Sequence, residues 1–164
     1  MSEEKRRPSD SEYGRPLPKP KPLPFLPERE WLYGRISKAE YEYVYYQGKI
    51  QYLTDKDTKE SILDPETKQP IERRQFAIEI ELRDFSLPNG EPRRAWIKLG
   101  ASMGAKANLP QFLRNLGFEE QNPTVQEILD FLKGIEVKLQ MANKVGKTSG
   151  EDYQAAIWDS VKPA

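Results

Sequence analysis

The sequence predicts a mainly β domain, a small barrel of five strands with a helical segment between its third and fourth strands, preceded by a disordered proline-rich arm. Three observations lead to this fold class. Seven of the 14 prolines lie in residues 1–27, apolar residues alternate with polar ones along much of residues 30–100, and the apolar spacing becomes helical in residues 109–132. We therefore expect an arm over residues 1–27 and one domain over residues 28–164.

The arm has no helix or strand periodicity. Four of its prolines alternate with other residues from Pro18 to Pro24, a pattern that favours extended polyproline II because each proline fixes φ and removes a backbone donor. We expect residues 1–27 to act as a disordered tether whose role the sequence leaves open. No internal repeat is expected in the domain that follows.

A long first strand is predicted to begin near Glu30. Tyrosines alternate with other residues from Tyr41 to Tyr45, and the pattern continues through Leu53 with an interruption near residues 37–39. Alternating aromatic residues in a strand more often pack than stack on bases. The polar residues 54–72 that follow are predicted to form a long exposed loop.

The second and third strands should form a hairpin. Residues from Phe76 to Leu82 show the cleanest alternation in the chain, and Asn89-Gly90 is typical of a two-residue hairpin turn. Such a turn would place Leu82 opposite Ile97 on the core face and Glu81 opposite Lys98 on the other face. Two faces with opposite character are therefore predicted for this hairpin.

Two short helices and two strands should complete the domain. The first helix is predicted over Leu109 to Leu116, and the second begins with Asn122 as its cap and Pro123 at its first position and ends at Gly134. A fourth strand is expected over Ile135 to Met141, and a fifth over Tyr153 to Val161. The loop between them, residues 143–152, contains Gly146 and Gly150.

Composition excludes several classes of function. The chain has no cysteine and no histidine, so it lacks a disulfide framework, a thiolate metal site and the usual general base at neutral pH. We expect a protein that is not an enzyme and needs no cofactor, soluble and cytoplasmic, without a membrane span. Lys plus Arg equals Asp plus Glu at 26 each, so a polyanion must be bound by a local basic patch.

The predicted order, β-β-β-α-β-β, is similar to that of the OB barrel. More narrowly, Gly134-Ile-Glu-Val-Lys-Leu, a Gly/Lys loop and Tyr153-Gln-Ala-Ala-Ile-Trp resemble the last two strands of phage-type single-stranded DNA-binding proteins. The resemblance implies that an oligonucleotide, DNA or RNA, lies across strands two and three and between the first and last hairpin loops. It also implies a role in replication or recombination, beside the proteins of those processes.

Strand three carries the first candidate residues for this interface. Arg94, Trp96 and Lys98 share the outward face, where cations can pair with phosphates and any base can stack on the indole. A structural alternative is equally compatible with the sequence: Trp96 packs against Arg83, and Lys98 is bridged to Glu81.

Further candidates come from the loops. Lys144 and Lys147 lie around the last hairpin loop and can close over a phosphate backbone, although a merely solvated loop explains them as well. Tyr46 and Lys49 are weaker candidates on the first strand. Arginines at the ends of strands two and three are expected to converge on the same surface if the barrel forms, namely Arg73, Arg74 and Arg93.

A second function is also compatible with the sequence. A barrel with zero net charge can use its aromatic face and proline-rich arm to bind another protein instead of a polyanion. Oligomeric state is left open by both hypotheses.

Overall fold

The computed structural model describes Gly14, Pro16 and residues 23–164. The predicted disordered arm over residues 1–27 therefore lies mostly outside the described residues. Its last part is packed onto the domain: Leu26 is buried, and its backbone N–H and carbonyl both bind the side-chain amide of Gln154, at 2.9 and 2.7 Å. The chain thus joins the domain just before the predicted boundary.

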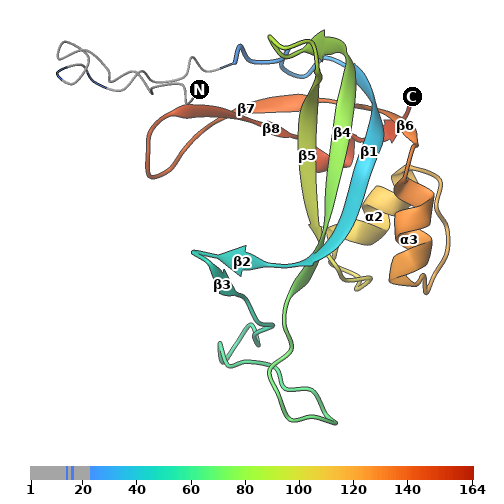
Figure 1. Cartoon of the computed structure of the whole chain (residues 1–164). Helices are drawn as coiled ribbons and strands as arrows, with labels where there is room; N and C mark the ends of the chain where they lie inside the picture. The colour runs from blue at the N-terminus through green and yellow to red at the C-terminus, as the bar shows by residue number, and fades with distance from the viewer. Residues whose placement is uncertain (1–13, 15, 17–22) are drawn as a thin grey trace, which may run out of the picture.

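The predicted mainly β fold is confirmed. Figure 1 shows a strongly curved antiparallel sheet of five strands in the order β5-β4-β1-β6-β9. The strands are β1 (Leu32–Tyr43), β4 (Arg74–Ser86), β5 (Pro92–Gly100), β6 (Glu136–Leu139) and β9 (Lys162–Pro163). Because β1 pairs with both β4 and β6, the longest strands lie at the centre of the sheet.

Two hairpins lie outside this sheet. One is formed by β2 (Tyr45–Tyr46) and β3 (Lys49–Ile50), the other by β7 (Met141–Val145) and β8 (Asp152–Ala156). β8 contacts β5, but no hydrogen-bonded ladder joins them within the described part of the chain. The sheet is therefore open along β5.

Two helices cover the inner face of the sheet. They are α2 (Asn108–Asn115) and α3 (Val125–Leu132), close to the predicted ranges. The predicted cap of the second helix is wrong, since Thr124 caps it: its hydroxyl oxygen accepts the Glu127 N–H at 3.1 Å. Asn122 and Pro123 precede the helix instead, because a capping box needs its acidic residue three positions after the cap. No helix in the described residues is long and apolar enough to span a membrane.

The core lies between the sheet and the helices. Phe76, Ile78 and Ile80 of β4 are almost fully buried there, as is Phe112 of α2. On β5 the alternation has the predicted direction: Ala95, Ile97 and Leu99 are buried, whereas Arg94, Trp96 and Lys98 are exposed on the outward face.

The predicted register of the β4–β5 hairpin is wrong. Glu81 lies opposite Arg94 and Ile78 opposite Ile97, so Leu82 does not face Ile97 and Glu81 does not face Lys98. The connection is wider than an Asn-Gly turn, because the Leu87 N–H binds the Glu91 carbonyl, and the ladder is irregular between Glu81 and Ser86. The shift is an even number of residues, so each side chain keeps its predicted face.

The first strand is shorter than predicted. Its interruption is confirmed as a bulge at Ser37, but the strand ends at Tyr43 and does not continue through Ile50 and Leu53. Gln47 and Gly48 reverse the chain with φ of 50° and 76°. Positive φ at both central residues is the signature of a tight hairpin turn.

Residues 44–73, which we call the finger, are an organised element, whereas the sequence predicts the end of the first strand up to Leu53 and an exposed loop over residues 54–72. Three of its segments meet in a closed ring of backbone hydrogen bonds, 2.8 to 3.0 Å long. The Val44 N–H donates to the Arg73 carbonyl, the Arg73 N–H to the Gln51 carbonyl, and the Gln51 N–H to the Val44 carbonyl. A second such ring follows further out, formed by Leu53, Ile62 and Ile71. Backbone bonds thus hold the finger together, since none of its residues belongs to the hydrophobic core.

The two outer limbs of the finger are an internal repeat that was not expected. In one, the Asp55 carboxylate accepts the N–H groups of Asp57 and Thr58 at 2.8 and 3.1 Å, and Lys59 has a φ of 62°. The same contacts recur, at the same distances, around Asp64, Glu66, Thr67 and Lys68. The donated hydrogen bonds, chiefly from Thr58, hold the pKa of Asp55 below its ordinary value.

The predicted fourth and fifth strands are each divided. β6 and β7 are separated at Gln140, whose N–H binds the Ser160 hydroxyl at 2.8 Å. β8 ends at Ala156 and is followed by a 3₁₀ turn, η1 (Trp158–Ser160), so the fifth strand does not extend to Val161 as predicted. The β7–β8 hairpin is therefore free to leave the plane of the main sheet.

Candidate nucleic-acid interface

The outward face of β5 presents the predicted triplet of cations and indole. Trp96 is 46% exposed, between Arg94 and Lys98 on the same face of the strand. Opposite Trp96 on β4 lies Glu79, a carboxylate on the same outward face. The indole is therefore available to a ligand, but in an acidic neighbourhood.

Both cations beside Trp96 are already paired. Arg94 contacts Glu79 at 3.2 Å and Glu81 at 3.9 Å, and Lys98 contacts Glu42 at 3.9 Å. The predicted partners, Lys98 with Glu81 and Trp96 with Arg83, are wrong because of the register shift. The cations of this face nevertheless pair with carboxylates of the same sheet, as the structural alternative expects, but with other partners.

The pair between Arg94 and Glu79 is the strongest of these contacts. The Glu79 side chain is only 11% exposed, and its Oε1 also accepts a hydrogen bond from the Ser37 hydroxyl at 2.9 Å. The bulge in β1 places Ser37 there as an extra residue. Because a largely buried carboxylate needs such partners, Arg94 is committed to the fold.

The two hairpins carry a different arrangement. On β2–β3, Tyr46 lies directly opposite Lys49, and on β7–β8, Tyr153 lies directly opposite Lys144. Directly opposite residues share a face of their hairpin, so each hairpin has one aromatic ring beside one ammonium group. Tyr46 is 66% and Tyr153 47% exposed.

The hairpin lysines differ from the cations of β5 in their ion pairing. No ion pair within the described residues involves Lys49, Lys144 or Lys147. Lys147 lies at the end of the β7–β8 hairpin, in a loop closed by a hydrogen bond from the Gly146 N–H to the Glu151 carbonyl at 2.9 Å. In Figure 1 both hairpins extend from the same side of the sheet.

The predicted convergence of the other arginines is only partial. Arg74 stacks on Tyr43, with its guanidinium carbon 4.1 Å from the ring centroid, and donates to the Tyr43 hydroxyl at 3.0 Å. Arg73 lies beside it, exposed at the base of the finger. Both are therefore close to the β2–β3 hairpin.

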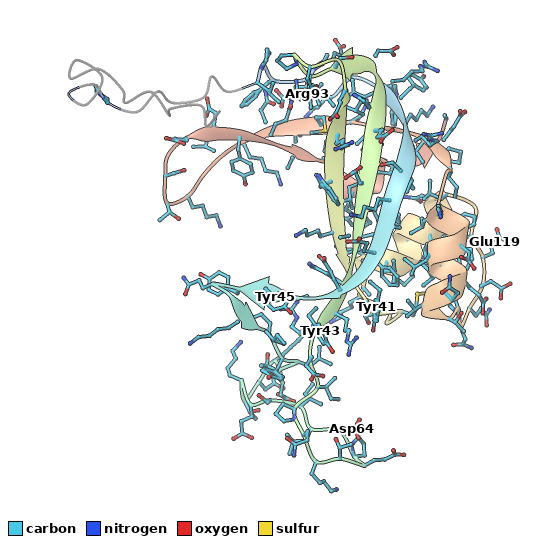
Figure 2. The ribbon with its side chains drawn as sticks, viewed as in Figure 1. Tyr41, Tyr43, Tyr45, Asp64, Arg93 and Glu119 are labelled. Carbon is cyan, nitrogen blue, oxygen red and sulfur yellow. The ribbon has the colours of Figure 1, made fainter. Side chains whose placement is uncertain are left out.

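Arg93 lies elsewhere. It is at the far end of β5, where it donates a hydrogen bond to the Pro24 carbonyl, and Figure 2 shows it at the opposite end of the sheet from Tyr43. Arg93 is seven residue steps along β5 from Gly100, whose partner on β4 is Gln75, next to Arg74; seven steps correspond to roughly 23 Å. Arg93 fastens the end of the arm and does not join the cluster at the finger.

One residue of this surface was absent from the predicted set. Tyr153 had been assigned only to a strand, yet it completes the aromatic and lysine pair on β7–β8. The signal was present in the sequence, since a hairpin closing over residues 146–151 requires Lys144 and Tyr153 to face each other.

Comparison of the chain with protein-family models gives no match, and no curated protein matches it either. The functional argument therefore rests on the geometry of the chain itself.

Proposed function

We propose that this protein binds single-stranded nucleic acid across the outward face of β5 and between its two hairpins. The observation that carries the proposal is the repeated pair of an exposed tyrosine and an unneutralised lysine, Tyr46 with Lys49 and Lys144 with Tyr153. Trp96 provides a third exposed ring on β5, which spans the distance between the hairpins in Figure 1.

The topology supports an OB-type barrel as the scaffold. Strands three, two, one and four of such a barrel correspond in order to β5, β4, β1 and β6, and the helices follow the third strand. The contact of β8 with β5 is on the side where a barrel of this type closes. In OB barrels the ligand lies over strands two and three, flanked by the loops that correspond here to the finger and the β7–β8 hairpin.

The binding mechanism follows from the side chains. Bases stack on Tyr46, Trp96 and Tyr153, and each stacked base contributes about 1–3 kcal/mol whatever its identity. The hairpin lysines neutralise phosphates and release counterions. Such binding has little sequence preference and suits a protein that covers single strands during replication or recombination.

A fluorescence titration tests the proposal. Oligo-dT of roughly 6 nucleotides, within the footprint of one OB domain, should quench the tryptophan emission when added at low salt. Trp96→Phe should remove most of this quenching, whereas Trp158→Phe, a change in the 3₁₀ turn, should retain it. Salt should weaken the binding. The proposal is wrong if the protein shows no binding at tens of micromolar concentration.

A protein-interaction module remains the second candidate, and the finger is the observation that favours it. Leu53, Ile62 and Leu63 are exposed there, and its turns carry the acidic residues Asp55, Asp57, Glu60, Asp64 and Glu66. A protein bound at this element would stay bound at salt concentrations that release oligonucleotide, and would be lost on the double change Ile62→Ser and Leu63→Ser.

A further inference from the structure

A second basic and aromatic cluster lies at the opposite end of the outward face from the finger. It consists of Trp31, Tyr33, Arg83, Lys138 and Lys162, and we call it the Trp31 cluster. The ammonium groups of Lys138 and Lys162 lie 4.8 and 5.6 Å from the indole centroid of Trp31. The Arg83 guanidinium lies 5.3 Å from the ring of Tyr33. Trp31 is 40% exposed, so the cluster is open to solvent.

The strand register forces these cations together. Lys138 on β6 lies opposite Tyr33 on β1, and on its other side it lies opposite Lys162 on β9. Like charges directly opposite each other in a sheet are destabilising. Within the described residues neither lysine has an ion-pair partner, so the indole offsets only part of this repulsion.

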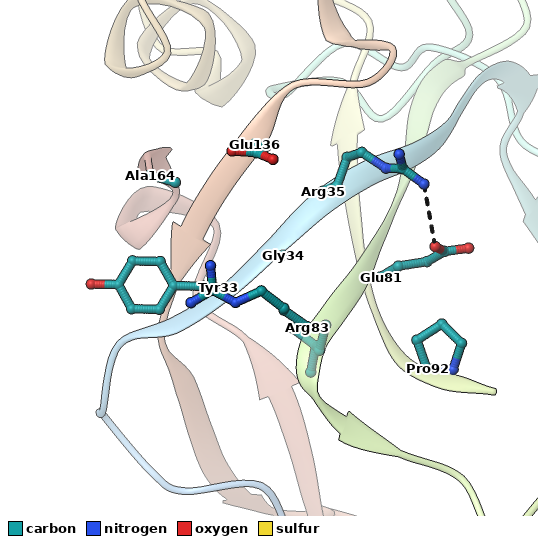
Figure 3. Close-up of a pocket in the computed structure, with 9 residues that line it drawn as sticks. Tyr33, Gly34, Arg35, Glu81, Arg83, Pro92, Glu136 and Ala164 are labelled. Carbon is teal, nitrogen blue, oxygen red and sulfur yellow. Dashed lines mark ion pairs between the residues drawn. The ribbon is translucent and has the colours of Figure 1, made fainter. Parts of the chain in front are cut away.

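An open pocket of about 310 Å³ adjoins the cluster (Figure 3). Tyr33, Arg35 and Arg83 line it, together with the carboxylates of Glu81 and Glu136. Arg35 forms an ion pair with Glu81 at 3.8 Å, and the one ion pair of Arg83 within the described residues is with the exposed Asp84, at 3.6 Å. Arg83 is therefore the pocket cation that is easiest to recruit for an anion, because its present partner is a solvent-exposed carboxylate.

The cluster is continuous with the proposed binding face. Arg35 lies opposite Glu81, and Glu81 lies opposite Arg94. A single row of side chains therefore leads from the pocket to Arg94, which lies two residues before Trp96 on β5. Glu136, opposite Arg35 on β6, extends this row. The row alternates in charge and is neutralised internally, whereas the Trp31 cluster beyond it is not.

We propose that the Trp31 cluster is a second phosphate-binding station, which holds the backbone of a single strand after it has crossed the outward face. This inference rests on the proposed function and extends it. The nucleic-acid strand is bound at the hairpins and again at Lys138, Lys162 and Arg83. A nucleic-acid strand long enough to reach both the hairpins and the Trp31 cluster binds more tightly than a short one, because one ligand then occupies both sites.

The chemistry favours a polyanion as the occupant of this cluster. Opposed lysines repel each other in the free protein, and a phosphate between them reverses that cost. Another candidate occupant is the set of acidic residues at the turns of a second copy's finger, which would make the cluster a contact between protein molecules. The test below distinguishes the two.

The experiment compares a charge-removing variant with a matched control. Lys138→Gln and Lys162→Gln together remove both charges and leave polar side chains that are one atom shorter. Lys106→Gln and Lys133→Gln remove two lysines next to the helices. Anisotropy of labelled oligo-dT is measured with strands of roughly 6 and roughly 20 nucleotides, lengths chosen within and beyond the usual footprint of one OB domain.

The cluster variant should bind the long strand roughly tenfold more weakly than the wild type, with a salt slope reduced by about 1.4 for two lost phosphate contacts. Its affinity for the short strand, and both affinities of the control, should be unchanged. Lys162→Gln alone should lower the long-strand affinity in the same direction, and it serves if the double variant does not fold.

Equal affinity of wild type and cluster variant for the long strand would overturn the second station while leaving the proposed function intact. Binding of neither strand by the wild type would overturn both. Self-association of the wild type in sedimentation velocity without oligonucleotide, lost in the cluster variant, would assign the cluster to a contact between copies and overturn the phosphate station.

Discussion

The sheet and the hairpins that project from it use charged residues in opposite ways. On the outward face of β5, Arg94 and Lys98 form ion pairs with carboxylates of the same sheet, Glu79 on β4 and Glu42 on β1. On the hairpins, Lys49 and Lys144 each stand beside an exposed tyrosine. The cations beside Trp96 therefore serve the fold, whereas the hairpin lysines, like the lysines of the Trp31 cluster at the other end of the sheet, are available to a ligand.

This difference has a physical basis in burial. On the outward face of the sheet, Glu79 is largely buried among its neighbours, and a carboxylate with so little access to water needs partners such as Arg94 and Ser37. The hairpins have little core and remain in water, where a lone lysine costs nothing. A chain with zero net charge can therefore still present local positive sites.

The largest expected effect separates the two regions by stability. Phe76→Ala, in the buried face of β4, should lower the free energy of unfolding by about 3–5 kcal/mol. Ile62→Ala in the finger should change it by less than about 0.5 kcal/mol, since Ile62 is exposed. Urea denaturation measures both, and a comparable loss in the two variants would show that the finger contributes to the global fold.

The next effect concerns binding. Tyr46→Ala and Tyr153→Ala should each weaken oligo-dT binding by about 1–3 kcal/mol, the value of one stacked base, with little change in stability. Tyr52→Ala, another exposed tyrosine of the finger, is the control and should bind as the wild type does. An equal loss of affinity in all three variants would contradict specific stacking of bases on Tyr46 and Tyr153.

Glu79→Gln should have opposite effects on stability and on binding. Arg94 loses its closest carboxylate, so the free energy of unfolding should fall by roughly 1–2 kcal/mol. The released guanidinium can then meet a phosphate, and oligo-dT should bind more tightly. Weaker binding in a folded Glu79→Gln variant would contradict the view that this ion pair competes with the ligand.

The smallest effect is a local one in the finger. Because the pKa of Asp55 is lowered in the fold, its turn is favoured above the unfolded pKa, and this contribution is lost as the pH falls through the folded one. The amide resonances of Asp57 and Thr58 should shift in that acidic window. Asp55→Asn should abolish the titration, and Asp57→Asn should preserve it, since Asp57 joins the turn through its backbone N–H.

Periodicity in the sequence was sufficient to predict the elements and their faces, but not the register. Apolar alternation predicted that Ile97 is buried and Trp96 exposed, since a strand has only two faces. The partners of Arg94 and Lys98 depended on the width of the turn after Leu87, which involves a hydrogen bond across five residues. A propensity for Asn-Gly turns does not determine that width.

The finger and the Trp31 cluster were missed for different reasons. The repeat around Asp55 and Asp64 is visible in the sequence once Asp-x-x-Thr-Lys is compared between residues 55–59 and 64–68. By contrast, Trp31 directly precedes β1, and Lys138 and Lys162 belong to β6 and β9, which are distant from it in sequence. Only the order of strands in the sheet brings these residues together, and local sequence patterns do not predict that order.

The salt dependence of oligo-dT affinity tests the contrast between sheet and hairpins most directly. The triple variant Lys49→Gln, Lys144→Gln and Lys147→Gln should flatten the slope of log affinity against log salt by about 2, at roughly 0.7 for each lost phosphate contact. Arg94→Gln with Lys98→Gln should leave the slope close to that of the wild type, because those cations are already neutralised. A flatter slope in the variant with Arg94→Gln and Lys98→Gln, together with an unchanged slope in the triple hairpin variant, would contradict this contrast.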